Sequence, residues 1–265
     1  MHAGKYKTGT TTPEKESKSE ILFCAAPPTR YLNPATYDGA DLSDVRFFGN
    51  RFMSIVSKFK YLGSYISRDG SDTFDVDSRI SSAGKAFGAL RKCLFSSTNV
   101  SRQAKRAVYE GLILAILLYG SESWNLTESL LHRLRLFHAQ CLRAMSRVTR
   151  AHVRRHHISN QCLGQELGLD SIDVYVTRHQ LGWLGHVRRM DFDRLPRRML
   201  SAWVTSKRPP GAPTMTYGRT MHKALKKLNI EPEMWPALAA DRELWRETLK
   251  LGRPAVRRSL RQARR

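Results

Sequence analysis

The sequence contains few cysteines and no apolar stretch long enough to span a membrane. The longest apolar run, "LILAILLY" at residues 112–119, is far shorter than the roughly 20 residues that a transmembrane helix needs. The first 20 residues also lack the apolar core of a secretory signal peptide. The four cysteines are far apart and form no Cys-x-x-Cys pair, which favours free thiols in a reducing compartment. They are Cys24, Cys93, Cys141 and Cys162. These absences predict an intracellular protein, nuclear or cytoplasmic, that does not bind a membrane.

Patterns typical of catalytic and metal sites are missing as well. "YGSES" at 119–123 is not the Gly-x-Ser-x-Gly turn of serine hydrolases, and no glycine-rich loop has phosphate-binding spacing. A zinc site could be imagined, but no paired cysteines complete a tetrahedral set, so a basic connector is the better interpretation. Its candidate ligands are His152, His156, His157, Cys141 and Cys162. The sequence predicts no catalytic residue, no metal and no cofactor.

A run of four aspartates invites comparison with a calcium site. The run fails the EF-hand pattern, so we expect its members to stabilise the N-terminus of a helix instead. They are Asp69, Asp72, Asp75 and Asp77.

Positive charge is the strongest global signal that is present. Basic residues outnumber acidic ones by 45 to 23, which gives a net charge of +22. Residues 133–265 carry 28 basic and 10 acidic side chains, against 17 and 13 in residues 1–132. Basicity concentrated in one half is typical of proteins that bind nucleic acid. The alternative interpretation is a protein whose arginine-rich surface is simply exposed to solvent. We expect RNA and DNA to be bound mainly through their phosphates.

Hydrophobic spacing predicts a mainly helical protein with a short β element near the N-terminus. "EILFCAAP" at 20–27 and "FKYLGSYIS" at 59–67 are expected to be strands, the second ended by a turn at "RDG". From Asp72 the period becomes helical, with Ile80, Ala83, Phe87, Leu90 and Leu94 on one stripe.

Two more helices complete the expected bundle. Ser101 is expected to cap a helix that ends near Gly120, and Thr127 to open the next. The stripe of the latter contains Leu130, Leu134, Phe137, Cys141, Leu142 and Met145. Three consecutive amphipathic helices with short connections are typical of a helical bundle.

The C-terminal half is expected to be helical and basic. After the connector "TRAHVRRHH", Ser159 and Ser171 are expected to cap a short helix and a long one that reaches Met190. Residues 206–218 form a Pro/Gly-rich loop, "MHKALKKL" forms a helix, and 233–249 form one more, with Pro232 at its start. The last stripe, which we expect in the core, contains Trp235, Leu238, Trp245 and Leu249, with Arg242 in step.

The segment "LGWLGHVRRM" at 181–190 combines a tryptophan, two glycines, a histidine and paired arginines. On a helix, Trp183 and Met190 are expected in the core and His186 as a partly buried hydrogen-bonding residue. No general-acid partner lies nearby, so we do not assign His186 to catalysis. Gly182 and Gly185, three positions apart, would let another backbone approach closely.

Five segments occur in a fixed order: "FKYLGSYISRDG", "LLYGSESW", "LGWLGHVRRM" with "RLPRRML", "RPPGAP…Y" and "W…LAADRELWR". Together, over about residues 18–250, they resemble the C-terminal third of the reverse transcriptase polyprotein of non-LTR retrotransposons, the jockey-like and RTE-like elements. The resemblance implies that "FKYLGS" closes the palm and grips the primer end. The helices after Ser71 would be the thumb and "GHVRRM" part of a basic extension. Relative to this family, residues 46–57 look like either an insertion or a misread gene boundary.

The resemblance divides the chain into five parts: a loose segment, 1–19; a palm remnant with a primer-grip-like β element, 20–70; a thumb-like bundle, 71–150; a basic helical region, 151–250; and a basic tail, 251–265. The expected partners are a template–primer duplex and the remainder of a reverse transcriptase. The predicted contacts with nucleic acid are Lys60, Tyr61, Gly63, Arg154, Arg155, Arg188, Arg189, Arg197, Arg198, Lys207 and Arg208.

The catalytic part of such a polymerase is not found in this sequence. A polymerase of this kind holds two magnesium ions with palm carboxylates, one pair of them in a YxDD-type hairpin. "YDGAD" at 37–41 has the wrong spacing, so the resemblance implies a non-catalytic, nucleic-acid-binding fragment of the enzyme. Two alternatives are part of an active RNA-directed DNA polymerase and a degenerate reading frame without a selected function. Neighbouring coding sequence with an in-frame YxDD segment would favour the active enzyme.

Overall fold

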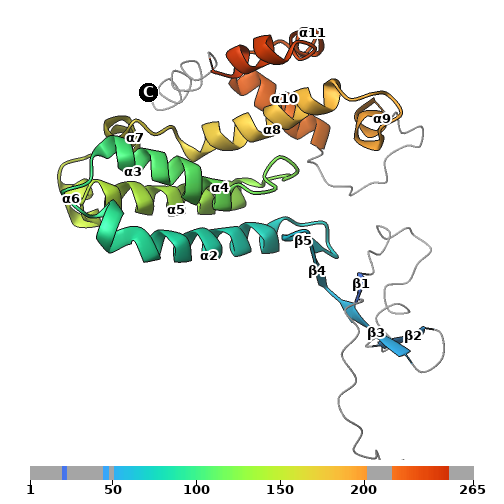
Figure 1. The fold of residues 1–265 in the computed structure, drawn as a ribbon, viewed down its shortest axis with the longest axis horizontal. Helices are drawn as coiled ribbons and strands as arrows, with labels where there is room; N and C mark the ends of the chain where they lie inside the picture. Colours follow the sequence, from blue (N-terminus) through green and yellow to red (C-terminus); the bar gives the residue numbers. More distant parts are fainter. Residues whose placement is uncertain (1–19, 23–43, 48–50, 202–216, 251–265) are drawn as a thin grey trace, which may run out of the picture.

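The computed structural model describes residues 20–22, 44–47, 51–201 and 217–250. The protein is mainly helical with short strands near the N-terminus, which confirms the predicted fold class (Figure 1). The expectations for residues 1–19, Lys207, Arg208 and the tail 251–265 lie outside the described residues.

Two small sheets precede the helices. In the first, β3 (Arg51–Val56) lies between β1 (Glu20–Leu22), which is parallel to it, and β2 (Asp44–Phe47), which is antiparallel. The strand predicted from Glu20 is therefore confirmed as far as the described residues reach. The sequence reasoning did not predict β2 and β3. The end of β2 and all of β3 lie within the segment 46–57.

The second sheet is a hairpin of β4 (Lys58–Tyr61) and β5 (Ser64–Ser67). The prediction of one continuous strand over 59–67 was wrong. Both residues of the turn have positive φ, 46° at Leu62 and 89° at Gly63, as in the type I′ turn that joins antiparallel strands. A leucine at positive φ is uncommon, and the contacts that hold it there are described below.

The helical bundle begins with α2 (Thr73–Leu90), which continues as a π-helical turn, η1 (Arg91–Phe95). α3 (Arg102–Val108), a second π-helical turn η2 (Tyr109–Ile113) and α4 (Leu114–Leu117) form the next rod, and α5 (Glu128–Met145) the third. The predicted caps are confirmed. Ser101 Oγ accepts from Ala104 N at 3.2 Å and Thr127 Oγ1 from Leu130 N at 3.4 Å.

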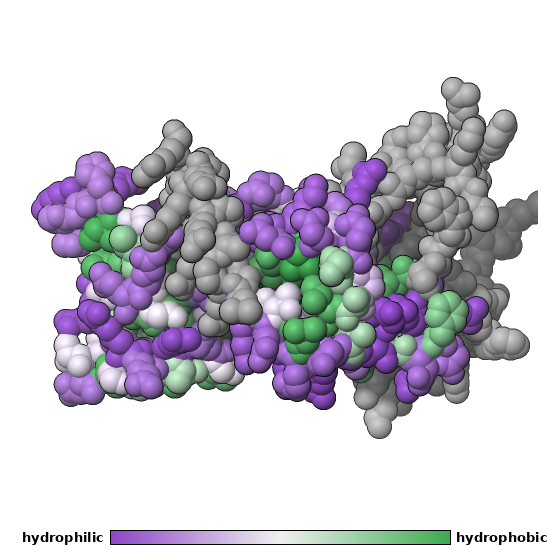
Figure 2. Space-filling model, turned by 90° about the horizontal axis from the view of Figure 1, so that it is seen from above, coloured by the Kyte–Doolittle hydropathy of each residue, from purple (hydrophilic) through white to green (hydrophobic). Residues whose placement is uncertain are grey.

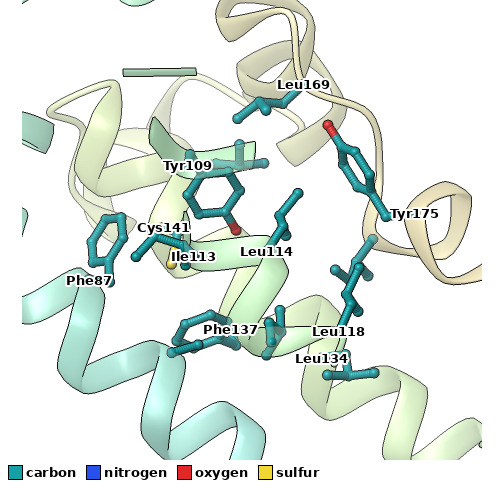
Figure 3. Close-up of a cluster of buried hydrophobic side chains, with 14 of the residues drawn as sticks. Phe87, Tyr109, Ile113, Leu114, Leu118, Leu134, Phe137, Cys141, Leu169 and Tyr175 are labelled. Atoms are coloured by element: carbon teal, nitrogen blue, oxygen red, sulfur yellow. The ribbon is translucent and has the colours of Figure 1, made fainter. Parts of the chain in front are cut away.

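α6 (Arg150–Arg155), α7 (Asn160–Leu167) and α8 (Ile172–Arg188) follow. Ser159 caps α7 as predicted, whereas Ser171 stands at the start of α8 without a side-chain capping bond. The first hydrophobic core runs from α2 to the first half of α8 (Figure 3). The predicted α5 stripe is buried throughout, and Phe87, Tyr109 and Leu118 close over it from α2 and the α3–α4 rod.

A second hydrophobic core joins the rest of α8 to the C-terminal helices α9 (Leu195–Ser201), α10 (Tyr217–Lys227) and α11 (Trp235–Leu238). Residues 242–250 form a further helix, so the single helix predicted over 233–249 is broken. Asp241 Oδ1 accepts from Glu243 N and Leu244 N and so starts a new helix. The start of the first piece is also corrected, because Pro236 rather than Pro232 stands in its opening turn. Tyr217 and Gly218 belong to α10, not to the predicted loop.

The segment 181–190 lies in α8 and the turn after it, with its core face on Leu181, Leu184 and Val187. Trp183 and Met190 are only half-buried, and His186 is exposed, so these three expectations were wrong. The buried stripe passes beside them because successive helical residues are rotated by 100°.

The two glycines of this segment behave differently. Gly185 meets the indole of Trp245, which confirms a close approach, although by a side chain rather than a backbone. At Gly182, no atom of the described residues lies within 4 Å of the position where a Cβ would be. Trp245 is 2% exposed and its Nε1 donates to Leu181 O at 2.9 Å, which confirms its place in the core.

Within the described ranges, no helix is long and apolar enough to cross a bilayer. In the same ranges, no three His, Cys, Asp or Glu side chains come together as metal ligands would. The ring centres of His152 and His156 lie 4.3 Å apart, and the two rings are tilted by 41° to each other.

Candidate nucleic-acid interface

The tip of the β4–β5 hairpin is docked onto the loop after α4. Tyr119 Oη donates to Leu62 O at 3.0 Å. Arg79 of α2 donates from Nη2 to Gly63 O at 2.6 Å, and its guanidinium lies 4.4 Å from the centre of the Tyr119 ring. These bonds satisfy both carbonyls of the strained turn and fix its position. They also bring together "FKYLGSYIS" and "LLYGSESW", which are more than 50 residues apart in the chain.

Asp75 holds together the junction between the β4–β5 hairpin, α2 and the loop after α4. This carboxylate is only 3% exposed, and it accepts hydrogen bonds from Tyr65 N at 3.0 Å and from Trp124 Nε1 at 2.8 Å. Arg79 Nε is 3.7 Å from it. One side chain thus ties β5, α2 and the loop between α4 and α5 to each other.

Gly120 makes the contact between loop and hairpin sterically possible. Its φ is +79°, and a Cβ at this position would lie 2.8 Å from Ser64 Oγ. Both the conformation and the space therefore require glycine.

The aspartates expected to stabilise a helix start do more than that. Asp72 and Asp75 stand at the start of α2, but their side chains bind neighbouring segments. Asp72 Oδ2 accepts from Asn125 N at 2.7 Å, and burial raises the pKa of its carboxyl group. Asp69 instead binds Ser67 Oγ and Ser71 N within its own turn, and Asp77 pairs with Arg133.

The outer side of this junction is exposed, aromatic and cationic. Leu62 is 75% exposed, Tyr61 57% and Tyr119 52%. Lys58 Nζ lies 4.6 Å from the centre of the Phe74 ring, and Lys60 Nζ lies 5.9 Å from that of Tyr65. We call this the hairpin surface: Lys58, Lys60, Tyr61, Leu62, Gly63 and Tyr119. Exposed rings can stack on bases while lysines attract phosphates.

The predicted contact residues do not form one site. Lys60, Tyr61 and Gly63 lie together in the hairpin surface. Arg154 and Arg155 are exposed on α6, at the opposite end of the bundle (Figure 1). Arg188 and Arg189 end α8, whose 17 residues extend over about 25 Å, and Arg197 and Arg198 lie on α9. A single nucleic acid that contacted both the α6 arginines and those at the end of α8 and on α9 would therefore have to be long.

Arg189 has a structural contact as well. Its Nη1 donates to Ala239 O at 2.8 Å, which fastens the end of α8 to the end of α11. The coloured part of the face in Figure 2 is mostly hydrophilic, with hydrophobic residues in groups between the hydrophilic ones.

The sequence reasoning missed three members of the surface, which are Lys58, Leu62 and Tyr119. For Tyr119 a signal was present, because an aromatic residue directly before a glycine that needs positive φ stands at an exposed helix end.

A neighbouring pair, Ser121 Oγ and His179 Nδ1 at 3.3 Å, suggests nucleophilic chemistry at first sight. Ser121 is 0% exposed, however, so the pair instead fixes the loop to α8.

Comparison with known proteins gives a remote similarity. Over 195 residues the chain is 24% identical to a protein of Caenorhabditis elegans described as uncharacterized and transposon-derived. The alignment covers 72% of this chain and 69% of the worm protein. No protein-family profile matches the chain, and no solved structure does.

Proposed function

We propose that this chain is a non-catalytic nucleic-acid-binding protein derived from the thumb and C-terminal region of a non-LTR retrotransposon reverse transcriptase. Three findings support the proposal. The similar worm protein is described as transposon-derived, five segments resemble that enzyme in order, and the fold is the mainly helical one that the resemblance implies.

The observation that carries the proposal is the bond between Tyr119 and the Leu62 carbonyl. It joins the primer-grip-like segment to the thumb-like helices and leaves an aromatic, lysine-bearing tip exposed. Such a tip suits the end of a duplex, where the last base pair offers a flat face for stacking and the backbone offers phosphates.

The carboxylates near the tip support a binding role over a catalytic one. Magnesium in a polymerase needs carboxylates that face substrate. Asp75 is buried against Trp124 and Tyr65, and Asp72 is engaged by Asn125. We therefore expect no primer extension by the isolated chain with Mg²⁺ or Mn²⁺.

Salt dependence is the first test of the binding proposal. The affinity for a primer–template duplex should fall linearly on a log–log plot against salt, by about 0.9 for each phosphate neutralised. Fluorescence anisotropy at several salt concentrations measures this slope, and duplexes of unrelated sequence should give nearly equal affinities because phosphates carry no sequence information. Absence of binding at low salt, or an affinity indifferent to salt, would remove the proposal.

A further inference from the structure

A cavity of about 740 Å³ lies between α5, α6, α7 and the start of α8, at the end of the bundle far from the hairpin surface (Figure 1). Its size is within the range of small-ligand pockets. One wall is cationic, with Arg143, Arg150 and Arg154, and is flanked by the side-chain amides of Asn160, Gln161 and Gln165. An apolar strip of Leu142, Val153 and Ile158 lies beside it.

The charges on this wall are not balanced. No carboxylate in the described part of the chain lies within salt-bridge distance of Arg143, Arg150 or Arg154. Two carboxylates also line the cavity, but each has its own cation. Asp173 pairs with Arg135 at 2.5 Å, and Asp170 pairs with Arg178 at 3.3 Å. The excess positive charge therefore remains on the side formed by α5 and α6.

Arg143 and Arg150 are the centre of this excess. They line the cavity and also a second hollow of about 430 Å³, to which Arg91 of η1 contributes. Burial, followed by the charge of Arg150, lowers the pKa of Arg143. Two guanidinium groups held near each other without an anion favour binding one, because its charge offsets their repulsion.

We propose that this cavity binds one nucleotide of an RNA or DNA strand, with Arg143 and Arg150 on its phosphate and the apolar strip against its sugar or base. The inference rests on the proposed function and adds to it a second contact at the opposite end of the bundle from the hairpin surface. Guanidinium groups bind phosphate through paired hydrogen bonds, and the neighbouring amides can donate to or accept from a base edge.

The test compares variants of equal charge. Arg143→Gln combined with Arg150→Gln should weaken binding of a 16-nucleotide single strand by roughly tenfold to a hundredfold. The control combines Arg102→Gln with Arg147→Gln, two exposed arginines that line neither hollow and that should change affinity only through net charge. Gln161→Trp keeps the charge and places bulk in the cavity, so it should also weaken binding. Equal losses in both double variants, or full affinity in Gln161→Trp, would overturn the inference.

Two small probes separate a strand from a free nucleotide. Inorganic phosphate and AMP should raise the melting temperature of the wild type at millimolar concentration and not that of the Arg143/Arg150 variant. The strand should bind far more tightly than either. If AMP bound as tightly as the strand, the cavity would be a site for free nucleotides, which would contradict the inference. If the Arg143/Arg150 variant bound the strand as well as the wild type does, the cavity site would be rejected while the proposed function would stand. If the wild type bound neither strand nor duplex, the proposed function itself would be rejected.

Discussion

Replacing Gly185 by alanine is expected to lower the free energy of unfolding by roughly 2–4 kcal/mol. The new Cβ would lie 2.2 Å from Trp245 Nε1 and 2.4 Å from Cδ1, far inside van der Waals contact. The indole cannot withdraw cheaply, because it is buried and its N–H is bonded to Leu181 O. Either the two helices separate or this hydrogen bond breaks.

Gly182→Ala is the matched control in the same helix. None of the residues that the structure describes comes within 4 Å of its Cβ position, so alanine should be neutral or should stabilise the helix by up to about 1 kcal/mol. Urea unfolding followed by circular dichroism measures both variants. Trp245→Ala should cost about 3–5 kcal/mol, and its effect should not add to that of Gly185→Ala because it removes the clash. Equal stability of the two glycine variants would mean that α8 and the helix 242–250 do not meet as described.

Asp75→Ala is expected to cost roughly 3–5 kcal/mol and to release the hairpin from the bundle. The change leaves the N–H groups of Trp124 and Tyr65 without their acceptor and Arg79 without its carboxylate. Hydrogen exchange read by mass spectrometry should show faster exchange over 58–67, while the peptides of α5 and α7 change less.

Asp69→Ala is the control for this prediction. Asp69 is an exposed carboxylate of the neighbouring turn, and among the described residues it bonds to Ser67 and Ser71 alone, so its removal should cost no more than about 1 kcal/mol. The loss of stability in Asp75→Asn should lie between those of Asp75→Ala and Asp69→Ala, because an amide keeps one acceptor oxygen. If Asp75→Ala exchanged at the wild-type rate over 58–67, the hairpin would not be held by this carboxylate.

Local signals in the sequence predicted most of the helical framework. Apolar residues at three- and four-residue steps placed the stripes of α2 and α5 in the core, and the capping hydroxyls of Ser101, Thr127 and Ser159 marked three helix starts. These signals act within one turn of a helix and therefore need no knowledge of the rest of the fold.

Local breaks were harder to see. The alternation of 59–67 concealed a turn because Leu62 is an unusual residue at positive φ, and the bonds from Tyr119 to its carbonyl and from Arg79 to that of Gly63 hold the turn in place. The unpredicted strands β2 and β3 had a signal in Gly49–Asn50, a dipeptide common in hairpin turns. The break in the helix before Arg242 also had a signal in the sequence. Asp241 is a good N-cap residue and stands inside an apparently continuous apolar stripe.

The candidate site depends on contacts that no local pattern encodes. Asp75 looks like an ordinary first-turn acid until β5 and Trp124 are folded against it. Arg189 looks like a free cation until Ala239 approaches it from 50 positions away. Charge patterning identified the basic half of the chain, but it could not separate the arginines that hold the fold from those that are exposed to solvent.

The most direct test of the central claim is the preference of the hairpin surface for a primer end. The protein should bind a primer–template duplex with a recessed 3′ end about five- to a hundredfold more tightly than a continuous blunt duplex of equal length, since stacking on Tyr61 or Tyr119 adds roughly 1–3 kcal/mol. Lys60→Gln combined with Tyr61→Ala should abolish this preference. The control combines Lys85→Gln with Lys92→Gln, two exposed lysines outside the hairpin surface. It should lower the affinity for both duplexes equally and leave the preference for the recessed end unchanged. Equal affinity of the wild type for the two duplexes, or a preference that survives Lys60→Gln with Tyr61→Ala, would contradict the account.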